Sequence, residues 1–234
     1  MASTSEVTLG AKVANAETLV TYVESFAGYA PPQPDISVVN YKALITAAKN
    51  NNQSTAASLQ TWSAAIETRQ QLFFKAKDSV KKILSPIGAT VRSSFGKTAK
   101  EYTDIASLIN KIRGEKIPKE SKNDKGEFVS QSERSYGSIT QSFSDLITTL
   151  QGYAAGYSPV NASITIVALQ AKLTALTASN IGVAANYGQL KQNRDTRTAT
   201  YTDLSQRTQR IKDTVKSQYG QNSTEYSLIK GLKV

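Results

Sequence analysis

Two arginines in matching sequence contexts are the residues of this chain best suited to polar chemistry. Arg69 and Arg197 each follow an acidic residue and a threonine, and each falls on the apolar stripe of a predicted long helix. A guanidinium binds a carboxylate or another anion through parallel hydrogen bonds, and a buried charge without a partner is strongly destabilising. Glu101 and Glu225 also recur in matching Glu-Tyr pairs. The sequence therefore predicts structural ion pairs Arg69–Glu101 and Arg197–Glu225, with an anion pocket between helices as the alternative.

Basic residues exceed acidic ones, with 28 Lys and Arg against 18 Asp and Glu and a formal net charge of +10. The excess follows the later part of each half of the chain. A candidate anion-binding face there consists of Lys75, Lys81, Lys82, Arg207, Arg210 and Lys216. Such a face could contact nucleic acid, but no nucleic-acid-binding motif accompanies it. A solvated face of a long helix is the more common explanation of such a pattern.

Several kinds of chemistry are excluded by composition. The chain has neither cysteine nor histidine, so disulfides, thiolate nucleophiles and imidazole chemistry are absent. Carboxylates are sparse and show no metal-ligand spacing. Gly96-Lys97-Thr98 looks like the end of a P-loop, but Val91 stands where that motif requires its first glycine. We expect a protein that is not an enzyme and that has no catalytic residue, cofactor or metal.

Comparison of the chain with itself indicates a tandem duplication. At a shift of 128 residues Tyr29-Ala30-Pro31 falls on Tyr157-Ser158-Pro159, and the two acid-Thr-Arg triplets coincide. At a shift of 124 residues Phe95-Gly96 falls on Tyr219-Gly220, and the Glu-Tyr pairs coincide. Ordered matches over most of both halves predict repeats, since single matching triplets would be noise. The predicted segments are an N-terminal tail at 1–9, helical repeat 1 at 10–113, a charged linker or loop at 114–130, and helical repeat 2 at 131–234.

Each repeat reads as a helix, a proline-containing turn, a second helix and a long helix. Residues three and four apart form a stripe from Leu59 to Ile83 and another from Tyr187 to Val215, as in helices packed along their length. Pro86 should end or kink the first long helix. The predicted fold class is all-α: an elongated helical bundle built from two tandem homologous copies of a helix–helix–long-helix unit. The alternative is two separate three-helix units.

The end of the chain carries a further pattern. From Tyr219 to Val234 it passes through an aromatic-Gly pair, a Ser-x-Glu-Tyr run and a Lys-Gly pair. This ending resembles those of uncharacterised bacterial all-helical proteins. The resemblance implies a bacterial helical scaffold and brings no activity, cofactor or site residue with it.

These observations favour a non-catalytic structural or interaction protein, a helical scaffold that binds a protein partner or associates with itself. The alternative is a basic accessory protein that binds nucleic acid, and a weaker alternative is a membrane-active helical protein. The first residues lack a secretory pattern, and polar residues interrupt the most apolar stretch, 162–185. We therefore expect no membrane span and a cytoplasmic location.

Overall fold

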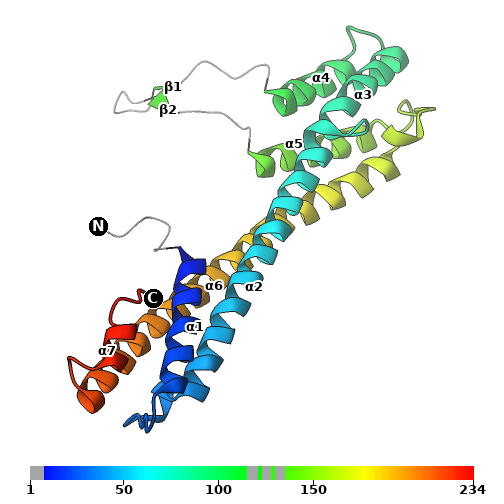
Figure 1. Cartoon of the computed structure of the whole chain (residues 1–234). Helices are drawn as coiled ribbons and strands as arrows, with labels where there is room; N and C mark the ends of the chain where they lie inside the picture. The colour runs from blue at the N-terminus through cyan, green and yellow to red at the C-terminus, as the bar shows by residue number, and fades with distance from the viewer. Residues whose placement is uncertain (1–7, 115–120, 123–127, 130–134) are drawn as a thin grey trace. The chain divides into compact units, whose positions relative to one another are not determined.

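Helices make up nearly all of the described structure, which confirms the all-α class (Figure 1). The computed structural model describes residues 8–114, 121–122, 128–129 and 135–234. Most of the predicted tail and linker lies outside these residues. The elements in chain order are α1 (Leu9–Ser25), the 3-10 turn η2 (Pro34–Ile36), α2 (Val38–Gln70), the π turn η3 (Gln71–Lys75), α3 (Val80–Phe95), α4 (Lys100–Arg113), β1 (Ser121–Lys122), β2 (Phe128–Val129), α5 (Tyr136–Gly152), the 3-10 turn η4 (Ala162–Ile164), α6 (Ile166–Tyr219) and α7 (Thr224–Ile229).

The second and third helices expected in each repeat are one continuous helix. α2 has 33 residues and α6 has 54, and neither contains proline. The polar stretches inside them consist largely of Asn, Gln, Ser, Thr and Ala, which a packed helix tolerates. Both helices start after a hydroxyl cap, because Ser37 Oγ accepts from the Asn40 N–H and Thr165 Oγ1 accepts from the Ala168 N–H, each at 3.3 Å.

The interruption of the first long helix lies upstream of Pro86, so the expectation that this proline ends the helix was wrong. α2 ends in the π turn η3, the chain turns at 76–79, and α3 restarts with the main-chain oxygen of the buried Ser79 accepting from the N–H groups of Lys82 and Ile83 at 2.9 and 3.1 Å. Pro86 sits inside α3. One missing N–H is a loss that a packed helix can absorb.

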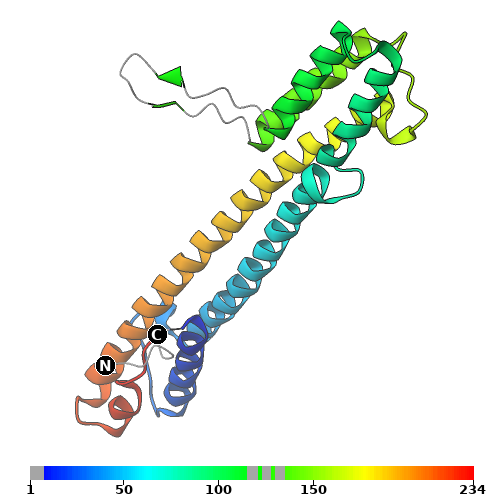
Figure 2. The ribbon, with the colours of Figure 1, turned by 90° about the horizontal axis from the view of Figure 1, so that it is seen from above.

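One compact unit contains Met1–Thr61 and Tyr187–Val234. In both views α1, the start of α2, the end of α6 and α7 lie side by side in this unit (Figures 1 and 2). The hydroxyls of Tyr41 on α2 and Thr208 on α6 form a buried hydrogen bond of 2.5 Å. The apolar core of this unit includes Val13, Leu19, Val23, Ile36, Ile45, Leu204, Ile211, Val215 and Ile229.

The other compact unit contains Trp62–Asn186. Here α4 packs against α3 and α5, and the first part of α6 completes the core. Lys172 of α6 forms an ion pair of 2.8 Å with Asp78, with its side chain only 10% exposed. The apolar core of this unit includes Phe73, Ile83, Ile87, Ile105, Ile109, Phe143, Leu146, Leu169 and Leu176.

Neither compact unit coincides with one of the predicted repeats. The first unit joins the start of repeat 1 to the end of repeat 2, and the second joins the end of repeat 1 to the start of repeat 2. The arrangement therefore differs from the alternative in which each repeat folds as a unit of its own. Each core requires helices from both halves of the chain.

The turns before α2 and α6 are held by the same interaction. The Tyr29 hydroxyl donates to the Ile36 carbonyl at 3.0 Å, and the Tyr157 hydroxyl donates to the Ile164 carbonyl at 2.7 Å. Both donors precede their acceptors by seven residues, so each tyrosine closes a loop around a 3-10 turn. Burial raises the pKa of both phenols to about 12, and the charge of Tyr219 adds to the effect at Tyr29.

We predict that Tyr157→Phe destabilises the protein by about 1–2 kcal/mol, because the buried Ile164 carbonyl loses its donor. Thermal unfolding at neutral pH measures the loss. Tyr102→Phe is the control, since the Tyr102 hydroxyl makes no hydrogen bond within the described residues, and it should leave the melting temperature nearly unchanged.

The same variant should also respond differently to alkali. A phenol whose pKa is raised in the folded state stabilises the protein fully below its unfolded value of about 10, and this contribution is lost as the pH rises toward 12. Tyr157→Phe should therefore lose less stability than the unchanged protein between these pH values. An identical decline in both proteins would contradict the assignment.

Candidate functional site

Arg69 has an aromatic partner in place of the predicted carboxylate. Its guanidinium carbon lies 3.9 Å from the ring centroid of Tyr136, the first residue of α5. The Tyr136 ring in turn meets Phe73 edge to face at 4.9 Å. The buried Arg69 Nε has no hydrogen-bond partner among the described residues. Arg69 therefore ties the end of α2 to α5 by stacking.

The predicted pairing of Arg69 with Glu101 was wrong, since no ion pair joins these two described residues. α3 ends at Gly96, whose φ of 93° suits glycine, and the chain reverses into α4. At the far end of α4, Arg113 donates to Ser85 at 2.6 Å. Glu101 therefore lies beside the end of α3 that is remote from Arg69, in the first turn of α4, where a carboxylate favours the positive end of the helix dipole.

Arg197 and Glu225 are likewise not joined by an ion pair in the part of the chain that the structure describes. Arg197 precedes the end of α6 by about six turns. Glu225 occupies the first turn of α7, which follows the reversal at Gly220, with φ of 99°. The recurrence of Glu-Tyr in the sequence thus marks two helix starts.

The six residues of the candidate anion-binding face have different surroundings. Lys75 pairs with Glu67 at 2.9 Å, and Arg207 pairs with Asp203 at 2.7 Å. Arg210 pairs with Asp35, and its guanidinium holds the pKa of that carboxyl below the ordinary value.

The remaining three basic residues differ again. The Lys216 ammonium lies 5.9 Å from the ring centroid of Tyr226. Lys81 and Lys82 are exposed in the first turn of α3. Among the described residues Lys81 and Lys82 have no ion pair or ring contact, whereas the other four basic residues each have one. The six residues therefore do not form one free basic surface within either unit.

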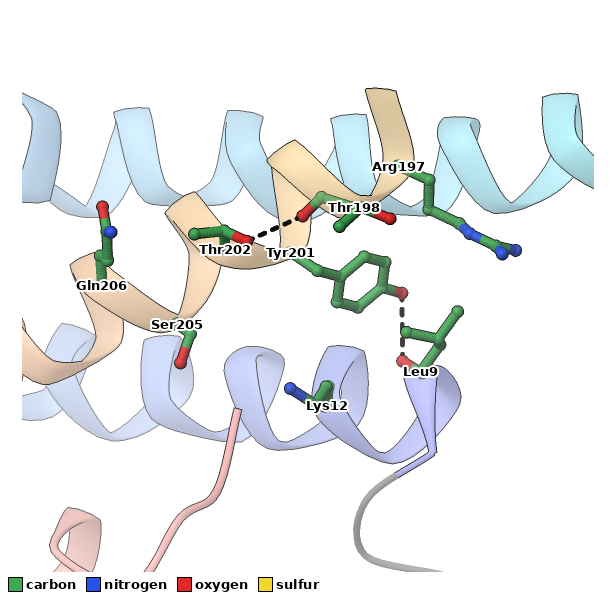
Figure 3. A pocket seen from close by; sticks show the side chains of 8 residues that line it. All are labelled: Leu9, Lys12, Arg197, Thr198, Tyr201, Thr202, Ser205 and Gln206. Carbon is green, nitrogen blue, oxygen red and sulfur yellow. Dashed lines mark hydrogen bonds between the residues drawn. The ribbon is translucent and has the colours of Figure 1, made fainter. Parts of the chain in front are cut away.

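A pocket between α1 and α6 does involve one of the predicted arginines. Its volume is about 460 Å³, and it lies entirely within the first unit (Figure 3). The Tyr201 hydroxyl donates to the Leu9 carbonyl at 3.1 Å and accepts from Asn52 Nδ2 at 2.7 Å, which connects α6 to both α1 and α2. The lining residues are Leu9, Lys12, Arg197, Thr198, Tyr201, Thr202, Ser205 and Gln206. Sequence reasoning named Arg197 but gave no signal for Lys12.

A second feature is an exposed apolar face on α6 in the other unit. Val167 is 76% exposed and Ile181 is 64% exposed, although both belong to a helix with a buried stripe on another side. Exposed residues three and four apart continue this α6 face, which consists of Val167, Ala171, Thr174, Ala178, Ile181 and Ala185. No side chain of the α6 face carries a charge. The three- and four-residue spacing of the α6 face can be recognised in the sequence, but the exposure of these side chains cannot.

The corresponding surface of α2 differs from the α6 face in its polarity. At a shift of 128 residues the exposed counterparts are Val39, Ala43, Thr46, Asn50, Gln53 and Ala57. Asn50 and Gln53 replace Ala178 and Ile181, so the α2 counterpart is polar along its centre. The apolar surface is therefore a property of α6 and not of long helices in this chain generally.

By length and composition alone, α6 is long enough and apolar enough to cross a membrane. Its most apolar window has a mean hydropathy of 1.2, and 17% of that window is buried. The core helix of a soluble protein can pass the same test. The low buried fraction of this apolar stretch agrees with the exposure of Val167 and Ile181 on the α6 face.

Comparison of the chain with protein-family models, with curated proteins and with solved structures finds no match.

We predict that Arg69→Met destabilises the protein by about 1–2 kcal/mol, because it removes a half-buried cation–π contact. Glu101→Gln should change stability by less than about 0.5 kcal/mol, since the carboxylate forms no ion pair with a described residue. Urea denaturation of both variants measures the two effects. If the two variants lost the same stability, the result would support the Arg69–Glu101 ion pair that the sequence predicted.

Proposed function

We propose that this protein is a non-catalytic helical interaction protein that binds a protein partner or a second copy of itself through the α6 face. The observation that carries this proposal is the exposure of Val167 and Ile181 on an uncharged helix face. Large exposed apolar residues aligned on one face are typical of interaction surfaces, whereas single scattered ones need no explanation.

The α6 face can be covered without leaving a polar group unsatisfied. Its polar side chain, Thr174, already donates to the Gln170 carbonyl at 3.2 Å. Burying Val167 and Ile181 is favourable by about 1.5–3 kcal/mol each, and the alanines allow a partner helix to approach closely. A helical partner suits these properties better than a charged polymer does.

The residue order of the α6 face favours a second copy as the partner. If two such faces pair antiparallel about the level of Leu176, Val167 meets Ala185, Ile181 meets Ala171, and Thr174 meets Ala178. Each larger side chain then faces an alanine, which is the alternation that well-packed helix pairs use. Such an interface is isologous, since the same patch serves both partners.

We also propose that the chain arose by tandem duplication into a bundle whose cores combine both copies. The starts of α2 and α6 differ by 128 residues, as do their preceding 3-10 turns, and the starts of α4 and α7 differ by 124. The change between the two shifts lies between Phe73, which matches Tyr201, and Val91, which matches Val215, and this stretch includes η3 and the turn that interrupts the first helix. These correspondences support the duplication.

The two alternative functions, nucleic-acid binding and membrane association, would use different surfaces of the protein. Nucleic-acid binding would require basic residues that in large part already have acidic or aromatic partners. Membrane association would use the same α6 face, so liposome flotation separates it from protein binding. Binding to duplex DNA with a steep loss of affinity as salt rises would favour the nucleic-acid alternative.

We predict that the protein forms a concentration-dependent dimer and that Ile181→Glu weakens its association by at least about tenfold, because a carboxylate would be buried within the interface opposite Ala171. Sedimentation velocity over a range of concentrations measures the dissociation constant. Gln53→Glu, at the matching position of α2, is the control and should leave it unchanged. A protein that stays monomeric at every concentration would exclude the second copy as partner.

Cross-linking tests the antiparallel register. Because the chain has no cysteine, a mixture of Thr174→Cys and Ala178→Cys proteins should form a mixed disulfide on oxidation. The control mixture, Thr46→Cys with Asn50→Cys on the counterpart surface of α2, should not. Equal cross-linking of both mixtures would contradict the proposed pairing.

A further inference from the structure

Half-buried cations in the described part of this chain have partners, with two exceptions. The exceptions are Lys12 and Arg197, which are not charge-paired or hydrogen-bonded through their side chains and which both line the pocket between α1 and α6. Each of the other half-buried cations has a partner: Arg69 contacts the ring of Tyr136, Arg113 binds Ser85, Lys172 binds Asp78, Arg207 binds Asp203, and Lys212 binds the Leu232 carbonyl. The unpaired cations therefore coincide in one place.

We propose that this pocket binds an elongated small anion that carries acidic groups toward both ends and hydroxyl groups between them, the chemistry of a sugar bisphosphate. A partly desolvated cation is costly unless an anion accompanies it. Among the residues that the structure describes, no carboxylate side chain lines the pocket, so an external anion is suited to supply the counter-charge.

The directions of the two side chains favour an elongated ligand over a single ion. Lys12 projects from α1 with its amine toward the side of Ser205, whereas Arg197 extends from α6 past Leu9 (Figure 3). An acidic group toward each end of a ligand suits two cations that point to different parts of the pocket. A volume of about 460 Å³ is within the range of sites for small organic molecules.

The hydroxyls of the pocket can act only as acceptors toward a ligand. The hydrogens of Tyr201, Thr202 and Ser205 are donated to main-chain oxygens of Leu9, Thr198 and Val234 at 3.1, 3.0 and 2.9 Å. Thr198 donates in the same way to the Arg194 carbonyl at 2.9 Å. Their oxygens retain lone pairs that accept from ligand hydroxyls, while Lys12 and Arg197 supply the donors for acidic groups.

Isothermal titration calorimetry of the full chain with fructose 1,6-bisphosphate, at fixed ionic strength, tests the proposal. We expect saturable binding that Lys12→Gln and Arg197→Gln each weaken by about tenfold or more, since each removes charge-assisted hydrogen bonds. Arg194→Gln is the matched control, because Arg194 is exposed on α6 and does not line the pocket. This control should bind as the unchanged protein does.

Two further titrations separate the parts of the proposal. Inorganic phosphate should bind at least about tenfold more weakly than the bisphosphate, and uncharged fructose should not bind measurably. Equal affinity for phosphate would overturn the elongated, hydroxylated ligand, and no binding of the bisphosphate would overturn the site itself. Melting curves without ligand confirm folding of the variants, which should melt no lower than the unchanged protein because neither cation has a charged or hydrogen-bonding partner among the described residues to lose.

Discussion

The fold depends on one constraint: neither long helix can bury its apolar stripe against its own half of the chain. Val13, Leu19 and Val23 of α1 cover the start of α2, but they also pack on Leu204, Ile211 and Val215 of α6, more than 180 residues away. In the other unit the residues of α3 and α4 share a core with those of α5 and the start of α6. Because α6 supplies residues to both cores, a change of register along this helix would disturb two sets of contacts at once. That coupling favours a single pairing of the halves.

The turns before α2 and α6 set that register locally. A phenol that donates to a carbonyl seven residues later fixes where the 3-10 turn ends, and the following hydroxyl cap fixes where the helix begins. These local contacts fix the direction in which the stripe of each long helix faces. A short, buried hydrogen bond is well suited to this task, since a shifted alternative would leave the carbonyl without a donor.

Sequence reasoning recovered the helical class, because the periodicity of apolar residues is a local property of the chain. It separated the continuous α2 into two helices, since a polar stretch inside a helix looks like a connection when its partners are unknown. It also assigned Arg69 to Glu101, where the hairpin between α3 and α4 places the carboxylate at the far end and Tyr136 beside the arginine. The existence of a partner was a sound physical requirement. Its identity depended on a contact between segments that only the fold brings together.

The distribution of acids then decides what the cations can do. Asp35, Asp78 and Asp203 pair with cations beside the cores, while Glu101 and Glu225 stand at helix starts, where the backbone dipole already stabilises them. Asp195, two residues from Arg197, is exposed on another face of α6 and cannot follow the guanidinium into the pocket. Water solvates the positive charges on exposed helix surfaces. Beside Tyr201 the protein holds two half-buried cations, and none of the described residues that line this pocket is acidic. A site of that kind can persist at little cost when an external anion completes it.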